Sequence, residues 1–141
     1  MNDGLLGGIV RLNLAVTQVL DEITGAAGIT LADYLVLGVV RGAPGHRSAP
    51  TAICEVLGRT TGGMSLTLDR LQSAGWVRRS PDPLDGRRVV VELTEAGLEL
   101  ATSVNAALHE WERSLDLPGP ADEVLRFVDD LTAAVQRRVP A

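Results

Sequence analysis

Seven arginines gather in the middle of this 141-residue chain, and arginine is the side chain best suited to bind phosphate groups and guanine edges. They are Arg47, Arg59, Arg70, Arg78, Arg79, Arg87 and Arg88. Between Pro44 and Val91 four acids oppose these seven arginines, a net charge of +3, whereas the remainder has six arginines against fourteen acids. The whole chain has a formal charge of −5. A basic segment inside an acidic protein indicates DNA binding, although a solvated surface cluster is the alternative.

The segment from Thr60 to about Ala74 predicts a helix with one face turned outward. Thr60 suits the N-cap, and Gly75 suits the stop that follows the helix. The buried face is expected to hold Met64, Thr67, Leu68 and Leu71. The outward face is expected to hold Ser65, Leu66, Asp69 and Arg70.

Such a helix offers several groups that DNA could contact. Its N-terminus, at Thr60, Thr61 and Gly62, has free N–H groups and a partial positive charge, which suit a phosphate. On the outward face with Ser65, Arg70 could bond guanine O6 and N7, and Leu66 could touch a thymine methyl. The alternatives are that Thr60 only caps the helix, and that Arg70 only forms a surface ion pair or contacts the DNA backbone.

A basic β-hairpin is expected directly after this helix. Residues 76–80 and 88–93 read as strands, and the link between them holds two prolines, two aspartates and a glycine, which favour turns. In the second strand Val89, Val91 and Leu93 fall on one face. A helix followed by a basic hairpin is the layout of a winged helix, which places the helix in the DNA major groove and the hairpin loop beside it.

The remaining segments predict helices that position this module. Apolar residues at steps of three and four predict helices over about 5–26, 31–40, 49–57, 94–115 and 122–138, with Thr30 and Thr94 as caps. The fold class is therefore mainly α with a small β-hairpin wing. We expect one chain, 1–141, with a winged-helix module at about 30–97 and helical dimerisation regions at about 1–28 and 98–141. A monomer whose terminal helices pack on each other is the alternative.

Composition excludes several classes of function. The chain has no lysine, which removes Schiff-base and P-loop lysine chemistry, and no acid–base pair, nucleophile or metal-ligand cluster stands out. We therefore expect no enzyme, no cofactor and no metal. A single cysteine, Cys54, fits a reducing cytoplasm and reads as a small buried hydrophobe. No apolar run of about 18 residues predicts a membrane span, and no signal peptide is evident.

Two stretches resemble the MarR family of winged-helix transcription regulators. Residues 80–97, Ser-Pro-Asp-Pro-Leu-Asp-Gly-Arg-Arg-Val-Val-Val-Glu-Leu-Thr-Glu-Ala-Gly, resemble its wing signature of Asp-Pro, Asp-x-Arg, a hydrophobic strand and Leu-Thr-x-x-Gly. Residues 71–77 resemble its step from helix into wing. Two departures are Gly86, where the family is often basic, and Gly62-Gly63, where larger polar residues are common.

The resemblance implies a function and roles for wing residues. Asp85 would pair with Arg87 and orient it toward the minor groove, with Arg88 a candidate phosphate contact. It further implies a homodimer on a pseudo-palindromic double-stranded operator, acting as a repressor that a small-molecule effector releases. A redox role for Cys54 is not expected, because the sensing cysteines of some members lie in the first helix. A winged-helix module that binds another protein without specific DNA binding is the alternative function.

Overall fold

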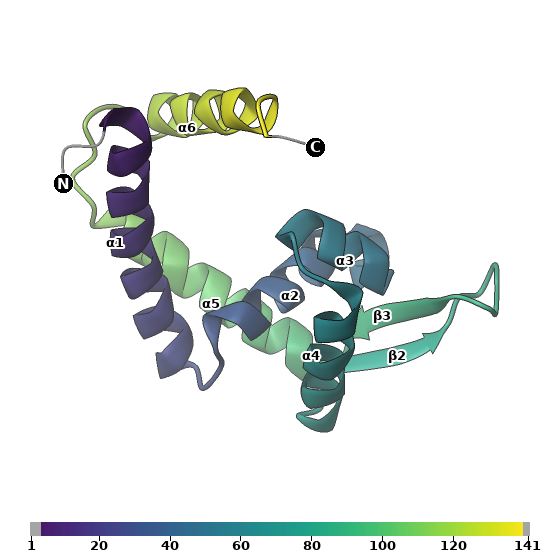
Figure 1. Ribbon diagram of the computed structural model, residues 1–141. Coiled ribbons are helices and arrows are strands. Elements are labelled where there is room, and N and C mark those ends of the chain that lie inside the picture. Colours follow the sequence, from purple (N-terminus) through teal and green to yellow (C-terminus); the bar gives the residue numbers. More distant parts are fainter. Residues whose placement is uncertain (1–3, 140–141) are drawn as a thin grey trace. The chain divides into compact units, whose positions relative to one another are not determined.

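The computed structural model describes residues 4–139 as six α-helices, a 3₁₀ helix and a three-stranded antiparallel sheet (Figure 1). In chain order the elements are α1 (Gly4–Ala26), α2 (Leu31–Gly42), η1 (Pro44–His46), β1 (Arg47–Ser48), α3 (Pro50–Leu57), α4 (Thr61–Ser73), β2 (Val77–Pro81), β3 (Val89–Leu93), α5 (Glu95–Arg113) and α6 (Ala121–Gln136). The predicted fold class is confirmed, and the predicted helix and strand ends differ from these by one or two residues.

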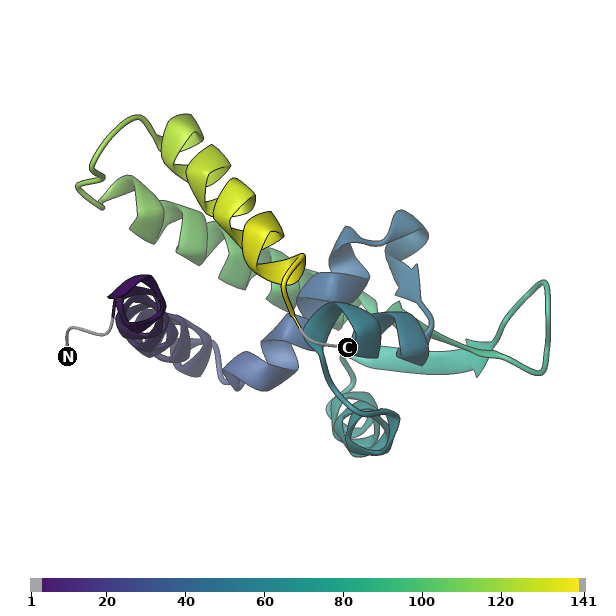
Figure 2. The same ribbon diagram turned by 45° about the horizontal axis from the view of Figure 1, so that its top comes forward.

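The chain divides into two compact units, Met1–His109 and Glu110–Ala141. The first contains α1 to β3 and most of α5, and the second contains the end of α5 and α6. Within the first unit the β2–β3 hairpin projects away from the helices, with its loop at the tip (Figure 2).

Threonine side chains start three helices of the first unit, as predicted. The hydroxyl of Thr30 accepts a hydrogen bond from the backbone N–H of Asp33 at 3.1 Å, and that of Thr60 accepts one from Gly63 at 3.3 Å. Thr94 does the same for Gly97 at 3.0 Å. Each cap satisfies an N–H that has no partner inside its own helix, so the caps fix where the helices begin.

The core of the first unit lies where α2, α3, α4, the sheet and α5 meet. Its fully buried members are mostly branched aliphatic side chains and include Val36, Leu37, Val40, Ile53, Met64, Leu71, Val77, Val91 and Ala101. Cys54 belongs to this core at 6% exposure, so it packs as a small hydrophobe, as expected.

The sheet has the strand order β1-β3-β2, with both pairings antiparallel. Val77 lies opposite Leu93 and Arg79 opposite Val91, which aligns the buried positions of the hairpin. Strand β1 was not predicted; it lies in the short connection between the predicted helices over about 31–40 and 49–57. Arg47 in β1 lies opposite Glu92 in β3, so this short strand fixes the start of α3 to the wing.

A tight joint connects the start of α5 to the start of the wing. The Thr94 hydroxyl donates to the carbonyl oxygen of Gly75 at 2.6 Å, and the Thr94 N–H donates to the carbonyl oxygen of Trp76 at 3.1 Å. A Cβ atom added to Gly97 would overlap that Trp76 oxygen and lie 2.8 Å from its carbonyl carbon. The final glycine of the Leu-Thr-x-x-Gly signature is therefore required by close backbone packing.

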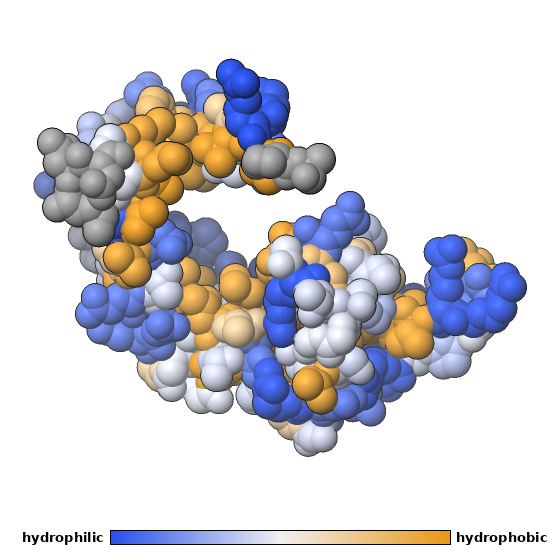
Figure 3. Space-filling view, viewed as in Figure 1, coloured by the Kyte–Doolittle hydropathy of each residue, from blue (hydrophilic) through white to orange (hydrophobic). Residues whose placement is uncertain are grey.

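Large apolar side chains stay exposed on α1 and, in the second unit, on α6; Figure 3 shows apolar surface on both helices. On α1 they are Leu5, Leu6, Val10, Leu12, Leu14 and Val16; on α6 they are Leu125, Phe127, Val128 and Val135. In the described residues no single helix is long and apolar enough to span a membrane; α1 and α2 pass that test only as a pair, which is bent by 83°.

Candidate DNA-binding surface

Helix α4 turns the expected side chains outward. Its four predicted core residues are buried, whereas Ser65, Leu66, Asp69 and Arg70 are exposed, Leu66 at 69%. Thr61 and Gly62 are exposed at its N-terminal end. The split follows from residue type, because Met64, Leu68 and Leu71 recur at helical spacing on one face, and Leu66 is the large apolar side chain left on the other.

The N-terminal end of α4 has open space around Gly62. The Thr60 hydroxyl is engaged as the cap, and a Cβ atom on Gly62 would meet no heavy atom within 4 Å. The N–H of Gly63 is taken by this cap, whereas Gly62 places no side chain in the way of an anion that approaches the helix N-terminus, where the helix dipole favours negative charge. This end of the helix can therefore approach a phosphate closely.

Replacing Gly62 with alanine separates this role from folding. The variant is expected to fold and to gain up to about 1 kcal/mol in unfolding free energy, because alanine forms helices better than glycine. Its affinity for operator DNA is expected to fall several-fold, because the methyl group occupies space that the phosphate backbone would use. Thermal unfolding and fluorescence anisotropy measure the two quantities, with Gly38→Ala in α2 as the control, since that site is equally open. Unchanged affinity would remove Gly62 from the interface.

Arg70 has a partner that the sequence reasoning missed. Its Nε donates to Asp33 Oδ2 at 3.0 Å and its Nη2 donates to Oδ1 at 2.6 Å, so the guanidinium grips the carboxylate with two bonds. These hydrogen bonds, together with the negative charge of Asp33, raise the pKa of Arg70. Arg70 is outward as predicted, and the alternative of an ion pair is present, with Nε and Nη2 directed at Asp33 of α2.

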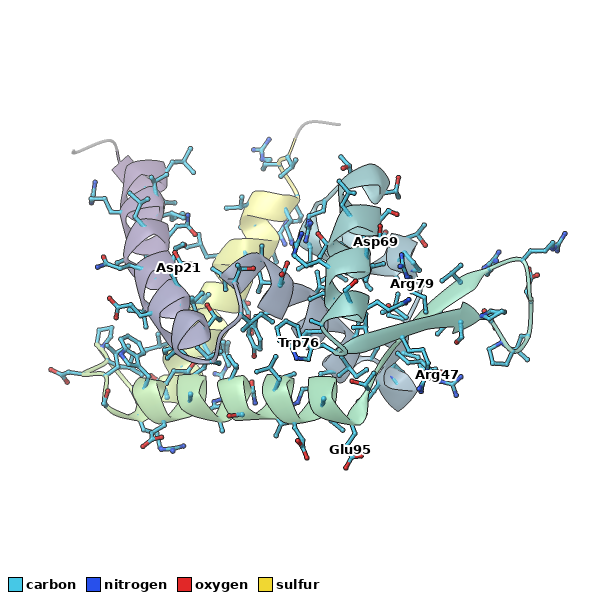
Figure 4. All side chains as sticks on the ribbon, turned by 90° about the horizontal axis from the view of Figure 1, so that it is seen from below. Asp21, Arg47, Asp69, Trp76, Arg79 and Glu95 are labelled. Carbon is cyan, nitrogen blue, oxygen red and sulfur yellow. The ribbon has the colours of Figure 1, made fainter. Side chains whose placement is uncertain are left out.

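Other arginines of the basic segment are also held by acids. Arg79 of β2 pairs with Asp69 of α4 at 2.6 Å and also donates to the side-chain oxygen of Gln72; Figure 4 shows Asp69 and Arg79 side by side. Arg47 and Arg78 both pair with Glu92, at 3.5 and 3.3 Å. These pairs connect β2 to α4 and connect β1 and β2 to β3. They also reduce the positive charge that is available to bind DNA.

Two aspartates shape the wing loop. Asp82 accepts a hydrogen bond from the N–H of Leu84 at 2.8 Å, and Asp85 accepts one from the N–H of Arg87 at 3.1 Å. Backbone bonds across the loop, from Asp82 N–H to Arg88 O and from Arg88 N–H to Asp85 O, close it at 2.9 and 3.0 Å. Aspartate side chains that accept a hydrogen bond from the N–H two residues on stabilise tight turns, which accounts for the Asp-Pro and Asp-x-Arg spacing.

The expected pairing of Asp85 with Arg87 is present. Arg87 Nε lies 3.2 Å from Asp85 Oδ1, and Arg88 Nε lies 3.6 Å from Oδ2. The Arg87 side chain is 92% exposed and that of Asp85 is 33% exposed. The Asp85 carboxylate, in the middle of the loop, thus pairs with Arg87 while most of the arginine side chain stays open to solvent. Among the described residues no group of three or more His, Cys, Asp or Glu could hold a metal ion.

Comparison with known proteins identifies the family. A model of the MarR family matches residues 27–88. The multiple antibiotic resistance protein MarR of Escherichia coli is 36% identical over 121 residues, which cover 84% of this chain and 83% of that protein. The crystal structure of a mutant MarR from E. coli complexed with operator DNA matches at 31% identity and a TM-score of 0.70, covering 96% of this chain and 94% of that one. CouR from Rhodococcus jostii, solved with p-coumaroyl-CoA, shares the fold at a TM-score of 0.84 and 19% identity, over 99% of this chain and 96% of CouR.

These matches extend over the exposed face of α4 and the aspartate-braced wing as well as the helices around them. The resemblance of the wing sequence to the family is thus supported by the fold and by a relative that covers most of the chain. The chain belongs to the MarR family of winged-helix transcriptional regulators, which bind DNA and are not enzymes.

Proposed function

We propose that two copies of this chain bind one pseudo-palindromic operator, with α4 of each copy in the major groove and the wing, residues 80–88, at the minor groove. The DNA contacts proposed for α4 are Thr60, Thr61, Gly62, Ser65 and Leu66, together with Arg70, which would contact a base edge and not a phosphate because Asp33 compensates its charge. Those proposed for the wing are Arg87 and Arg88, with Asp85 orienting Arg87. One observation carries the proposal: the exposed face of α4 and a hydrogen-bonded loop that presents the Asp85–Arg87 pair belong to the same compact unit. A narrow minor groove attracts such a guanidinium.

We further propose that residues 30–97 form the DNA-binding module and that residues 1–28 and 98–141 dimerise. The exposed leucines of α1 and the exposed Phe127 and Leu125 of α6 support this division, because large exposed apolar patches mark interaction surfaces. Sedimentation equilibrium tests it directly. A mass twice that of the 14.9 kDa chain is expected, and a monomer at micromolar concentration would contradict the dimer.

The proposed mode of action is repression in the cytoplasm, released by a small-molecule effector. The CouR structure with p-coumaroyl-CoA supports effector binding as a property that this fold can carry. An effector would act by binding one spacing of the two α4 helices more tightly than the other, since a ligand shifts an equilibrium only through such a difference.

Binding to DNA from upstream of the gene that encodes the chain tests the proposal, titrated against salt and random competitor DNA. We expect saturable binding that survives competitor and weakens steeply with salt, because each neutralised phosphate releases counterions. If the operator lies elsewhere in the genome, selecting the sequences that the protein binds from a pool of random DNA would identify it. If neither experiment yields salt-dependent, sequence-specific binding, the alternative of a module that binds another protein is favoured, in line with the net charge of −5.

A further inference from the structure

The carboxylate that holds Arg70 is buried. The Asp33 side chain is 6% exposed, in the first turn of α2, and the N–H of Asp33 is held by the Thr30 cap. A buried carboxylate is costly unless it is paired and hydrogen-bonded, and the start of a helix favours its negative charge. The buried Asp33 carboxylate therefore requires the Arg70 guanidinium, since breaking the pair would leave a buried negative charge without a partner.

The other arginine pairs of this surface differ in that respect. Asp69 is 58% exposed in its pair with Arg79, Asp85 is 33% exposed, and Glu92 is 24% exposed. Exposed pairs contribute little and exchange readily with water or phosphate. Among the described residues Asp33 is the most buried of the acids that pair with arginines of the basic segment, so Arg70 is the ion-paired arginine whose partner can least exchange it for water.

Holding Arg70 has a consequence for DNA binding. A free arginine on the flank of α4 would bind phosphate on any sequence, which raises non-specific affinity. An arginine gripped by two bonds has its charge compensated and its direction fixed, and it also fastens α4 to α2. The pair therefore lowers the affinity for DNA of any sequence and holds α4 in a single orientation.

We infer that Asp33 is a positioning residue for DNA recognition, which acts through Arg70 to raise the ratio of specific to non-specific binding. The inference rests on the proposed placement of α4 in the major groove.

The Asp33→Asn variant of the full chain tests it, through salt-titrated binding to the selected operator and to random DNA. Releasing Arg70 is expected to raise affinity for random DNA about three- to tenfold at low salt and to steepen the salt dependence by up to about 0.9 per protomer. The ratio of operator to random affinity is expected to fall. Glu99→Gln, at an exposed position on α5, changes net charge equally and is expected to change neither quantity.

The double variant Asp33→Asn with Arg70→Gln assigns the effect to Arg70. Its random-DNA affinity and salt slope are expected to return to the wild-type values. A merely structural pair would behave differently: Asp33→Asn would lower the melting temperature and weaken both kinds of binding in parallel. An unchanged ratio and an unchanged slope would overturn the inference.

Arg70→Gln alone keeps the inference testable if Asp33→Asn does not fold. Because Asp33 already compensates the charge of Arg70, this variant is expected to lose affinity for the operator without a change in salt slope. A slope lower by about 0.9 per protomer would show that Arg70 is a free phosphate-binding cation and would overturn the inference. Failure of the proposed DNA placement is distinguishable, because the wild-type protein would then show no salt-dependent operator binding.

Discussion

Arg87→Ala is expected to weaken operator binding about 10- to 100-fold and to leave the melting temperature unchanged. Arg87 is 92% exposed and its only ion-pair partner in the described residues is Asp85, so its removal costs the fold little. A specific arginine contact contributes about 1–3 kcal/mol, and a dimer would lose one at each wing. Anisotropy titration on operator and random DNA measures the loss, which we expect to be larger on the operator.

Arg88→Ala is the matched control, since Arg88 is 77% exposed and lies farther from Asp85, at 3.6 Å. It is expected to weaken binding to operator and random DNA equally and to lower the salt slope by about one per protomer, as a phosphate contact does. If Arg87→Ala changes neither the operator affinity nor the salt slope, the wing does not enter the minor groove.

Gly97→Ala is expected to destabilise the first unit by about 3 kcal/mol or more, a large fraction of the stability of a small domain. The added methyl would overlap the carbonyl oxygen of Trp76, which is backbone and already accepts the N–H of Thr94. Neither side of the contact can move without breaking the cap of α5 or the start of β2. Thermal unfolding followed by circular dichroism measures the loss.

The same substitution at Gly38 provides the control. Gly38 lies inside α2 with no heavy atom within 4 Å of an added Cβ, so alanine there is expected to stabilise by up to about 1 kcal/mol. Opposite signs at the two sites would show that the Gly97 effect comes from packing against Trp76. A melting temperature for Gly97→Ala within a degree or two of wild type would contradict the tight joint.

Features set by local chemistry were predictable from the sequence. Thr30, Thr60 and Thr94 cap helices because a threonine three residues before an open N–H can bond it, whatever the rest of the chain does. The Asp85–Arg87 pair spans two positions in a tight loop, so the family's signature and the loop geometry led to the same pairing.

Features set by distant residues were not predictable in this way. Asp33 and Arg70 are 37 positions apart, and no local pattern marks an aspartate as the partner of an arginine on another helix. Strand β1 has two residues and exists because β3 lies beside it. The family signature contains Gly97, but only the position of the Trp76 carbonyl supplies its physical reason.

The joint between α5 and the wing also has a mechanical consequence. Thr94 is bonded to both Gly75 and Trp76, and Gly97 leaves no free space against the backbone there. Because this connection is tightly packed, a rotation of the first turn of α5 would be transmitted to the hairpin, and the two would rotate together. The wing loop, which contains Arg87, lies at the far end of the hairpin (Figure 2), so a small rotation at the joint would displace the loop by more than it displaces the joint.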